Sequence, residues 1–244
     1  MTQHGSTTMQ TIPITNLVII ALPALLVLVI LRRWSDSASR SAYALARMVI
    51  QLCLIGYALT FIFETESSVL VLSVLSVMLC ASSWIALSSV PEQRSNLYFK
   101  ALLATFIVNS CLLGLITQVV LDTSPWYAPS IVIPLAGMVF AVGMNSISLF
   151  AERYFAELER TDETAARNIA YKATLIPITN SLMAVGLVSL PGMMTGQILS
   201  GVSPLIAVRY QIMIMLMFFT SSGLTSAMFY TLIRSSLIDI KDRR

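Results

Sequence analysis

Seven long apolar stretches dominate the sequence and constrain its fold more than any other feature. A helix needs about 20 mostly apolar residues to cross a hydrocarbon core about 30 Å thick. The stretches span Ile14–Leu31, Met48–Phe63, Val69–Leu87, Ala101–Leu121, Ile131–Leu149, Ala173–Leu190 and Pro204–Ile233. They predict an all-α membrane protein of about seven transmembrane helices, in which residues 1–244 form a single transmembrane domain with a polar N-terminal tail at 1–13.

The composition agrees with a membrane protein. Of the 244 residues, 57% are hydrophobic and 11% are charged, whereas soluble domains carry about 25% charged residues. The residues outside the apolar stretches are too few for a separate nucleotide-binding domain or a DNA-binding module, so we expect no nucleic-acid partner. The polar tail has no Lys or Arg, and we therefore expect that no signal peptide is cleaved from it.

The positions of the Lys and Arg residues predict the membrane topology. Fourteen of the 15 follow the first, third, fifth or seventh apolar stretch, and Arg209 is the exception. Because positively charged loops stay on the cytoplasmic side, the N-terminus should lie outside and the C-terminus in the cytoplasm. We expect a multi-pass protein of the cell (inner or plasma) membrane.

The densest run of charges lies between the fifth and sixth apolar stretches, at residues 151–172, which we call the elbow. We expect the fifth helix to continue to about Glu159, and a second helix to begin after Thr161, whose hydroxyl would cap it. Two interpretations stay open: a solvated hairpin whose apolar face rests on lipid headgroups, or a docking surface for a cytosolic partner. The residues of that apolar face are Tyr154, Phe155 and Leu158.

The helical pattern is interrupted after the sixth stretch. Pro191 and Gly192 should stop the sixth helix, because proline lacks the N–H and glycine is conformationally loose. Ser203-Pro204 should start the next helix, with Ser203 as its cap. We expect residues 191–203 to form a broken, re-entrant segment near the outer face, buried in protein or lining a water-filled cavity. Simple packing between helices is the alternative.

The predicted spans contain amides, hydroxyls and sulfur atoms but no Asp, Glu, Lys or Arg at their centres, which argues against proton relay and voltage sensing. Hydrogen bonds between helices explain most of these polar groups, with Asn109 as an example. The methionines are either soft thioether ligands or flexible packing, and the three cysteines are predicted to be small core residues. The candidates for a transport pathway are Gln51, Asn145, Thr179, Asn180, Met193, Met194 and Gln197.

Several functions are excluded by residues that the sequence lacks. The single histidine is His4 in the polar tail, which excludes a His-dependent protease and a His-ligated metalloenzyme. No Gly-Lys dipeptide occurs, so the chain has no P-loop for ATP. No internal repeat supports an inverted-repeat carrier. A transport function would therefore need energy from another subunit.

Three stretches carry a family resemblance: ARMVIQLCLIGY (Ala46–Tyr57), AGMVFAVGMNSISLFAERYFAEL (Ala136–Leu158) and LIPITNSLMAVGLVSLPGMMTGQILSGVSPLIAVRYQ (Leu175–Gln211). They resemble the membrane-spanning permease of the FetB-like iron-export ABC transporters, whose plant relatives are the aluminium-sensitivity transport proteins. The likeness covers roughly residues 40–230, and the third stretch is the most specific.

The resemblance implies two identical subunits that work with two copies of a separate cytosolic P-loop ATPase. ATP would bind on that partner, and this chain would hold no cofactor and be no enzyme itself. The elbow would be the coupling element that receives the motion of the ATPase. Its candidate coupling residues are Arg153, Glu157, Arg160, Glu163 and Arg167.

The resemblance leaves the substrate open. The bacterial family name implies export of iron or a related metal, and the plant relatives imply a nucleotide sugar such as UDP-glucose. For a metal cargo, Met193, Met194 and Gln197 would offer transient ligands at the outer exit, but no metal-ligand set is assigned. Acids in the outer loops would attract cations there: Glu64, Glu66 and Asp122. A non-transporting assembly or sensor protein of the membrane is the alternative that needs no ATPase.

Overall fold

The computed structural model describes residues 13–35, 37–64 and 67–241, without the side chains of Ile14 and of residues 235–241. Glu66 and nearly all of the polar tail lie outside this part of the chain. Every long element among the described residues is a helix, which confirms the all-α fold. The contacts divide the chain into two units, Met1–Glu64 and Thr65–Arg244, and each unit is described by itself.

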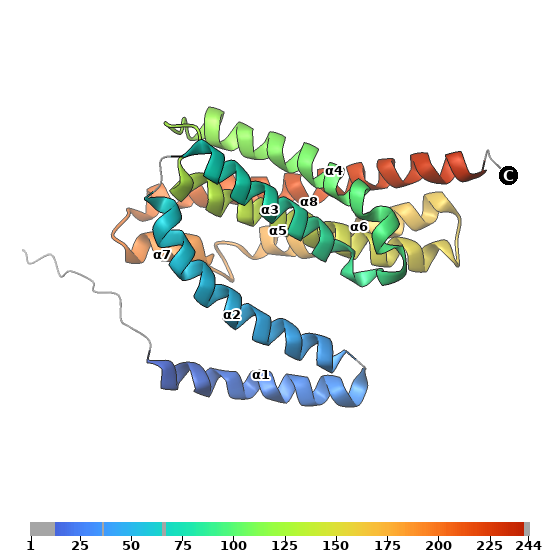
Figure 1. Cartoon of the computed structure of the whole chain (residues 1–244), viewed down its shortest axis with the longest axis horizontal. Coiled ribbons are helices and arrows are strands. Elements are labelled where there is room, and N and C mark those ends of the chain that lie inside the picture. The colour runs from blue at the N-terminus through green and yellow to red at the C-terminus, as the bar shows by residue number, and fades with distance from the viewer. Residues whose placement is uncertain (1–12, 36, 65–66, 242–244) are drawn as a thin grey trace, which may run out of the picture. The chain divides into compact units, whose positions relative to one another are not determined.

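The first unit is a pair of long helices joined by a short connection (Figure 1). α1 spans Ile14–Trp34 and α2 spans Ala38–Phe63, so α2 begins well before the apolar stretch predicted at Met48. The most apolar part of α1 contains no buried residue within the structure. A helix that is apolar on all sides is typical of a membrane span.

Helices also build the second unit. Two 3-10 turns, Leu87–Ser89 and Pro91–Gln93, connect its first two helices, and a π-helix at Leu115–Val120 continues the second of them. The α-helices of the unit are α3 (Ser68–Ala86), α4 (Arg94–Gly114), α5 (Pro129–Leu158), α6 (Glu163–Ala184), α7 (Gly192–Leu199) and α8 (Pro204–Lys241).

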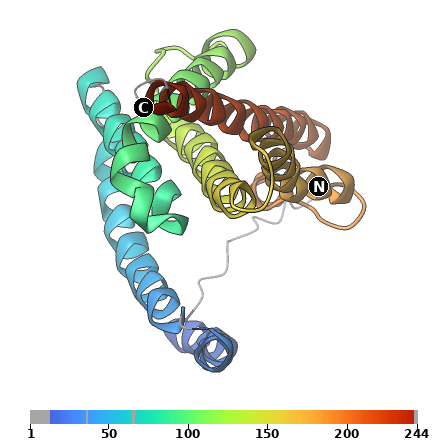
Figure 2. The ribbon, with the colours of Figure 1, turned by 90° about the vertical axis from the view of Figure 1, so that its right-hand side faces the viewer.

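α5 is the central helix of the second unit, because it packs against α3, α4, α6 and α8. Figure 2 looks toward the elbow end, where α5, α6 and α8 come together. Small residues let these helices approach closely. Fully buried alanines of this kind are Ala101 and Ala104 on α4, Ala151 on α5, and Ala166 and Ala170 on α6.

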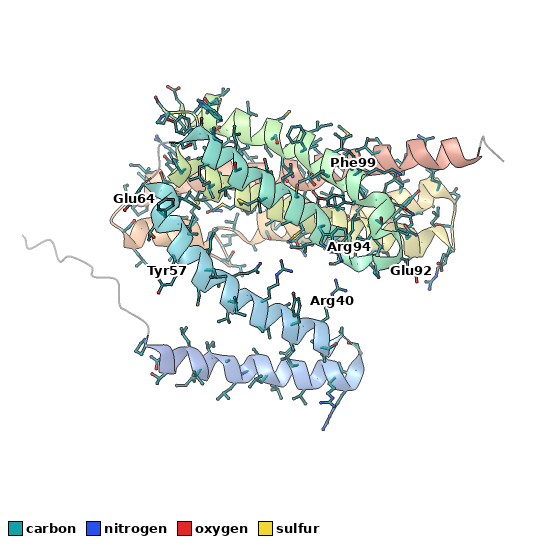
Figure 3. The ribbon with its side chains drawn as sticks, in the orientation of Figure 1. Arg40, Tyr57, Glu64, Glu92, Arg94 and Phe99 are labelled. Atoms are coloured by element: carbon teal, nitrogen blue, oxygen red, sulfur yellow. The ribbon has the colours of Figure 1, made fainter. Side chains whose placement is uncertain are left out.

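The connection between α3 and α4 is held by Arg94, which is labelled in Figure 3. Its Nε and Nη2 donate hydrogen bonds to the Trp84 carbonyl at 3.0 and 2.7 Å. Its guanidinium carbon lies 3.8 Å from the centre of the Trp84 ring, and Tyr98 meets the same tryptophan edge-on at 5.6 Å between ring centres. The cation–π contact and the hydrogen bonds together fix the turn.

The described part of the chain has six helical segments that are long and apolar enough to cross a membrane. They correspond to six of the seven predicted stretches, which supports a multi-pass membrane protein. Which side faces the cytoplasm stays a prediction. The segments are Thr15–Trp34, Ala38–Phe63, Ser68–Ser89, Pro91–Val120, Pro129–Leu158 and Pro204–Arg234.

The sixth predicted span, Ala173–Leu190, is not among these segments. α6 ends at Ala184, so its part after Ala173 rises roughly 18 Å at 1.5 Å per residue, less than a hydrocarbon core of about 30 Å. Gly186 adopts a φ of 84°, a left-handed conformation that is typical just after a helix. The helix therefore stops before residue 190.

Pro191 and Gly192 start a helix instead of stopping one, so the predicted role of this pair is wrong. Pro191 is the N-cap of α7, whose first residue is Gly192. The predicted restart at Ser203-Pro204 is confirmed: Pro204 is the first residue of α8, and the Ser203 carbonyl accepts a hydrogen bond from the Ala207 N–H at 3.0 Å. A re-entrant path of residues 191–203 in the membrane stays a prediction.

Candidate functional site

The elbow consists of the end of α5, a tight turn and the start of α6, close to its expected form. α5 ends at Leu158, and the N–H groups of Arg160 and Thr161 both donate to the Glu157 carbonyl at 2.9 Å. α6 is capped by Asp162, whose carboxylate accepts a hydrogen bond from the Ala165 N–H at 2.6 Å. The predicted cap at Thr161 is therefore wrong by one residue. A carboxylate is the better cap here because it also suits the positive end of the helix dipole.

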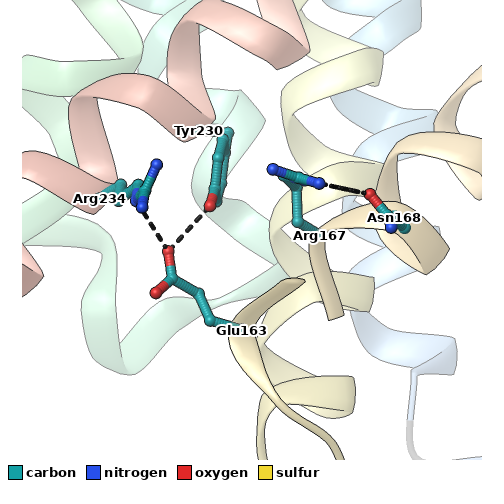
Figure 4. A network of polar contacts seen from close by, with 5 residues as sticks. All are labelled: Glu163, Arg167, Asn168, Tyr230 and Arg234. Carbon is teal, nitrogen blue, oxygen red and sulfur yellow. Dashed lines mark hydrogen bonds and ion pairs between the residues drawn. The ribbon is translucent and has the colours of Figure 1, made fainter. Parts of the chain in front are cut away.

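One acidic side chain of the elbow joins α6 to α8. Figure 4 shows the Glu163 carboxylate between Tyr230 and Arg234. The Tyr230 hydroxyl donates a hydrogen bond to Glu163 Oε1 at 2.8 Å, and Arg234 Nε lies 3.3 Å from the same oxygen. Two residues distant in sequence, Tyr230 and Arg234, thus tie the elbow to α8.

Arg167 lies beside this contact but does not reach the Glu163 carboxylate. Its guanidinium donates to Asn168 Oδ1, with Nη2 at 2.8 Å, and its guanidinium carbon lies 5.7 Å from the centre of the Tyr230 ring. Arg167 is half-buried, so it contributes more to the packing between α6 and α8 than to an outer surface.

Aromatic side chains fill the space beneath the elbow. Tyr154 is fully buried and stacks on Phe150 with 5.6 Å between ring centres, while Tyr230 meets it edge-on at 5.8 Å. Phe155 and Leu158 are partly buried against the same cluster. The interpretation that this face rests on headgroups is wrong, because the face packs inside the helical bundle.

Of the other candidate coupling residues, Arg153 and Arg160 are exposed and Glu157 is buried. Glu157 is only 9% exposed and pairs with the half-exposed Arg153 at 2.9 Å. Arg160 is exposed, and its side chain makes no hydrogen bond or ion pair with the described residues. The buried Glu157 and the half-buried Glu163 and Arg167 thus differ from Arg153 and Arg160, which are exposed positive charges.

Replacing Glu163 by glutamine should lower the free energy of unfolding by about 1 kcal/mol. The change removes a half-exposed ion pair, worth about 0–1 kcal/mol, and weakens a hydrogen bond to a charged acceptor. Tyr230→Phe removes a partner of the same carboxylate, so the two effects should be less than additive in a double-mutant cycle of detergent-solubilised protein. Strict additivity would contradict the contact between them.

A second polar cluster lies in the middle of the second unit. Asn109 on α4 is fully buried, and its Oδ1 accepts hydrogen bonds from Ser221 at 2.8 Å and from Thr225 at 3.2 Å. A Cβ built on Gly143 would lie 2.5 Å from Asn109 Nδ2, so α5 needs glycine at this point. This confirms the expected hydrogen bonding between helices at Asn109. The sequence analysis did not identify Gly143 as its counterpart.

The predicted pathway residues of the second unit do not form one cluster. Gln51 is exposed on α2 in the first unit, and Thr179 and Asn180 are exposed on α6. Asn145, also exposed, lines a cavity of about 220 Å³ between α5, α6 and α8. Thr179 and Asn180 do not line this cavity, whereas their neighbours Ile178 and Ser181 do.

Two adjacent methionines of α7 serve different cavities. Met193 lines a cavity of about 340 Å³ that also contains Asp122, and Met194 lines another of about 310 Å³ that contains Gln211. Gln197 is half-buried, and its Oε1 has no hydrogen-bond partner among the described residues.

Histidine, cysteine and carboxylate side chains do not gather into a metal centre in the described residues. No three side chains of the His, Cys, Asp or Glu type lie close enough there to hold an ion. Cys53, Cys80 and Cys111 are free and exposed, so the prediction that they are core residues is wrong.

Residues 14–166 and 163–238 match the family described as "Uncharacterised protein family (UPF0014)". The chain is 35% identical over 200 residues to the UPF0014 membrane protein slr1647 of Synechocystis sp., covering 75% of this chain and 77% of the relative. It is 31% identical over 201 residues to the "Probable iron export permease protein FetB" of Escherichia coli, covering 75% and 76%.

A plant relative is similar over the same extent. The chain is 28% identical over 200 residues to the "Protein ALUMINUM SENSITIVE 3" of Arabidopsis thaliana, covering 75% of this chain and 72% of the relative. No solved structure matches the chain. With matches across most of its length and several apolar helices, the chain belongs to the UPF0014 family of membrane proteins.

Proposed function

We propose that this chain is the permease subunit of an ABC-type exporter that moves iron or a related metal out of the cytoplasm. Two copies would form the membrane path, and two copies of a separate P-loop ATPase would bind at the elbow. The sequence holds no Gly-Lys dipeptide, so ATP hydrolysis is assigned to that partner. The relative from Escherichia coli, named a probable iron export permease, supports metal as the cargo.

The elbow is the single observation that carries this proposal. Its turn presents the exposed Arg160 at the end of the bundle, while Glu163 next to it is bonded to Tyr230 and Arg234 on α8. A partner that pushes on the turn would therefore move α5, α6 and α8 together. This arrangement fits a coupling element better than a passive loop, because a passive loop has no need for a connection to a distant helix.

The proposal also explains the division of charge in the second unit. The elbow end holds most of the basic residues of this unit, together with several acids, and the opposite end holds few charges, among them Asp122 and Arg209. Positive charge belongs on the cytoplasmic side. A carboxylate at the other end favours the departure of a cation toward the outside.

The test is to search for a P-loop ATPase gene beside that of this chain, co-express the two proteins, purify the complex and reconstitute it in liposomes. We expect the ATPase to co-purify and metal ions to stimulate ATP hydrolysis several-fold, with Fe(II) and Ag(I) tried separately. An ATPase variant with alanine for its P-loop lysine is the control for contaminating hydrolysis.

The other outcomes separate the alternatives. If UDP-glucose stimulates ATP hydrolysis and none of the metals does, metal export is contradicted and a nucleotide-sugar exporter is supported. If no P-loop ATPase binds the chain, it is not an ABC permease, and the assembly or sensor interpretation takes its place.

A further inference from the structure

The cavity next to Met193 combines groups that the sequence keeps far apart. It has a volume of about 340 Å³ and lies between residues 121–124, which follow the π-helix, and α5, α7 and α8, at the end of the second unit opposite the elbow (Figure 1). Three methionines line it, each from a different helix: Met138 from α5, Met193 from α7 and Met213 from α8. All three are half-buried, so their side chains are neither fully packed nor free in solvent.

Oxygen groups complete the lining of this cavity. Asp122 contributes a carboxylate and is the one charged residue among those that line it in the described part of the chain. The Thr123 hydroxyl is buried and has no hydrogen-bond partner among the described residues, and Tyr210 adds a phenol from α8. A buried hydroxyl without a partner costs free energy unless something binds it.

The backbone around Asp122 has unusual local geometry, which places residues 122 and 123 at the cavity. The last turns of α4 form a π-helix at Leu115–Val120, a rare form that often occurs at functional sites. Asp122 then takes a φ of 48°, which is left-handed and uncommon for a residue with a side chain. The Thr123 N–H bonds back to the Thr117 carbonyl at 2.9 Å, which holds residues 122 and 123 at the cavity.

The donor chemistry indicates which ions would bind. Thioethers are soft, polarisable ligands that select soft ions such as Cu(I), whereas Fe(III), Mg²⁺ and Ca²⁺ prefer oxygen ligands. Asp122 is an exposed residue, and its single carboxylate neutralises one positive charge, so a monovalent ion would form a neutral pair with it. A divalent ion would leave a charge uncompensated.

We propose that Met138, Met193 and Met213, together with Asp122, bind a soft monovalent metal ion in this cavity. This rests on the proposed function for metal as the cargo and narrows that cargo from iron to a related soft metal, bound near the outer exit. Thioethers bind such an ion without holding it irreversibly, which suits a site that must release its cargo.

The neighbouring cavity supplies a matched control. It has a similar volume of about 310 Å³ and contains Met194, the next residue of α7, with Met215 from α8. The residues that line it include no Asp, Glu, Lys or Arg. Met194→Leu therefore makes the same chemical change one residue away, without touching the proposed ligands.

The experiment measures Ag(I) binding to the purified full-length chain in detergent, by titration calorimetry in chloride-free buffer, with Ag(I) as a redox-stable soft probe. Because thiols bind Ag(I) more tightly than thioethers do, the three free cysteines, Cys53, Cys80 and Cys111, are replaced by serine in every protein compared. The variants are Met193→Leu with Met213→Leu, Asp122→Asn, and the control Met194→Leu. Leucine keeps the size and apolar character of methionine and removes the sulfur. Elution as a single peak in size-exclusion chromatography checks that each variant is folded.

We expect one Ag(I) per chain, at least tenfold weaker binding for the double variant, severalfold weaker binding for Asp122→Asn, and a change below twofold for Met194→Leu. Unchanged binding in the double variant, or an equal loss in Met194→Leu, would overturn the site. This experiment contains neither ATP nor the ATPase, so the two proposals fail separately. If Ag(I) binds but no metal stimulates ATP hydrolysis by the complex, only the exporter is refuted. If Fe(II) stimulates hydrolysis but Ag(I) does not bind, only this site is refuted.

Discussion

Replacing Gly143 by alanine should destabilise the second unit by about 1–3 kcal/mol, the usual cost of overpacking a close-packed core. The added Cβ would lie 2.5 Å from Asn109 Nδ2, closer than such atoms approach. Asn109 cannot turn away freely, because its Oδ1 is held by Ser221 and Thr225. Thermal unfolding in detergent, followed by far-UV circular dichroism, measures the loss.

A compensating variant tests the cause of this loss. Asn109→Ala removes the side chain that meets the new methyl group, so Gly143→Ala should cost much less in that background than in the natural protein. The sum of the two single losses in unfolding free energy should exceed the loss in the double variant by at least about 1 kcal/mol, as is typical of residues in contact. Equal costs in both backgrounds would mean that Asn109 is not the obstacle.

Gly114→Ala is the matched control, since Gly114 lies on α4, the same helix as Asn109. A Cβ at Gly114 would meet nothing within 4 Å, and alanine is favoured over glycine inside a helix by roughly 0.5–1 kcal/mol. We therefore expect this variant to be as stable as the natural protein or slightly more so. A loss as large as that at Gly143 would show that any added methyl group disturbs the membrane helices.

The sequence predicts the helices of this protein well, because apolar length is a local property. Six predicted stretches coincide with long helical segments, and the turn between α5 and α6 falls where charges replace apolar residues. The sixth stretch was extended too far because Ala184–Leu190 is as apolar as a span. Val185 is already extended and Gly186 follows it with a left-handed φ, and a valine and a glycine in an apolar run do not reveal these conformations in advance.

The candidate site is less predictable, because it depends on which faces of the helices meet. Tyr154 reads as part of a surface face of the elbow, but Phe150 and Tyr230 cover it. Glu163 reads as a solvated charge at a helix start, and its partner Tyr230 lies on α8, far along the chain. Met193 and Met194 are adjacent in sequence, yet neighbouring residues of a helix point in different directions and line different cavities.

Reversing the charge of Arg160, by replacing it with glutamate, should weaken binding of the ATPase subunit by at least tenfold. Arg160 is exposed on the turn of the elbow, so the change leaves the fold of the permease intact and acts on the partner's surface. Placing a like charge against a docking surface costs several kcal/mol. Binding is measured by titrating the ATPase onto the permease in nanodiscs, together with the rate of ATP hydrolysis.

Two further variants show whether the elbow both binds the partner and transmits its motion. Arg209→Glu makes the same charge reversal on an exposed residue near the start of α8, at the end opposite the elbow, and should leave ATPase binding unchanged. Glu163→Gln loosens the contact with Tyr230 and Arg234, so it should keep ATPase binding but reduce the stimulation of hydrolysis by metal. If Arg160→Glu binds the ATPase as tightly as Arg209→Glu does, the elbow is not the docking surface.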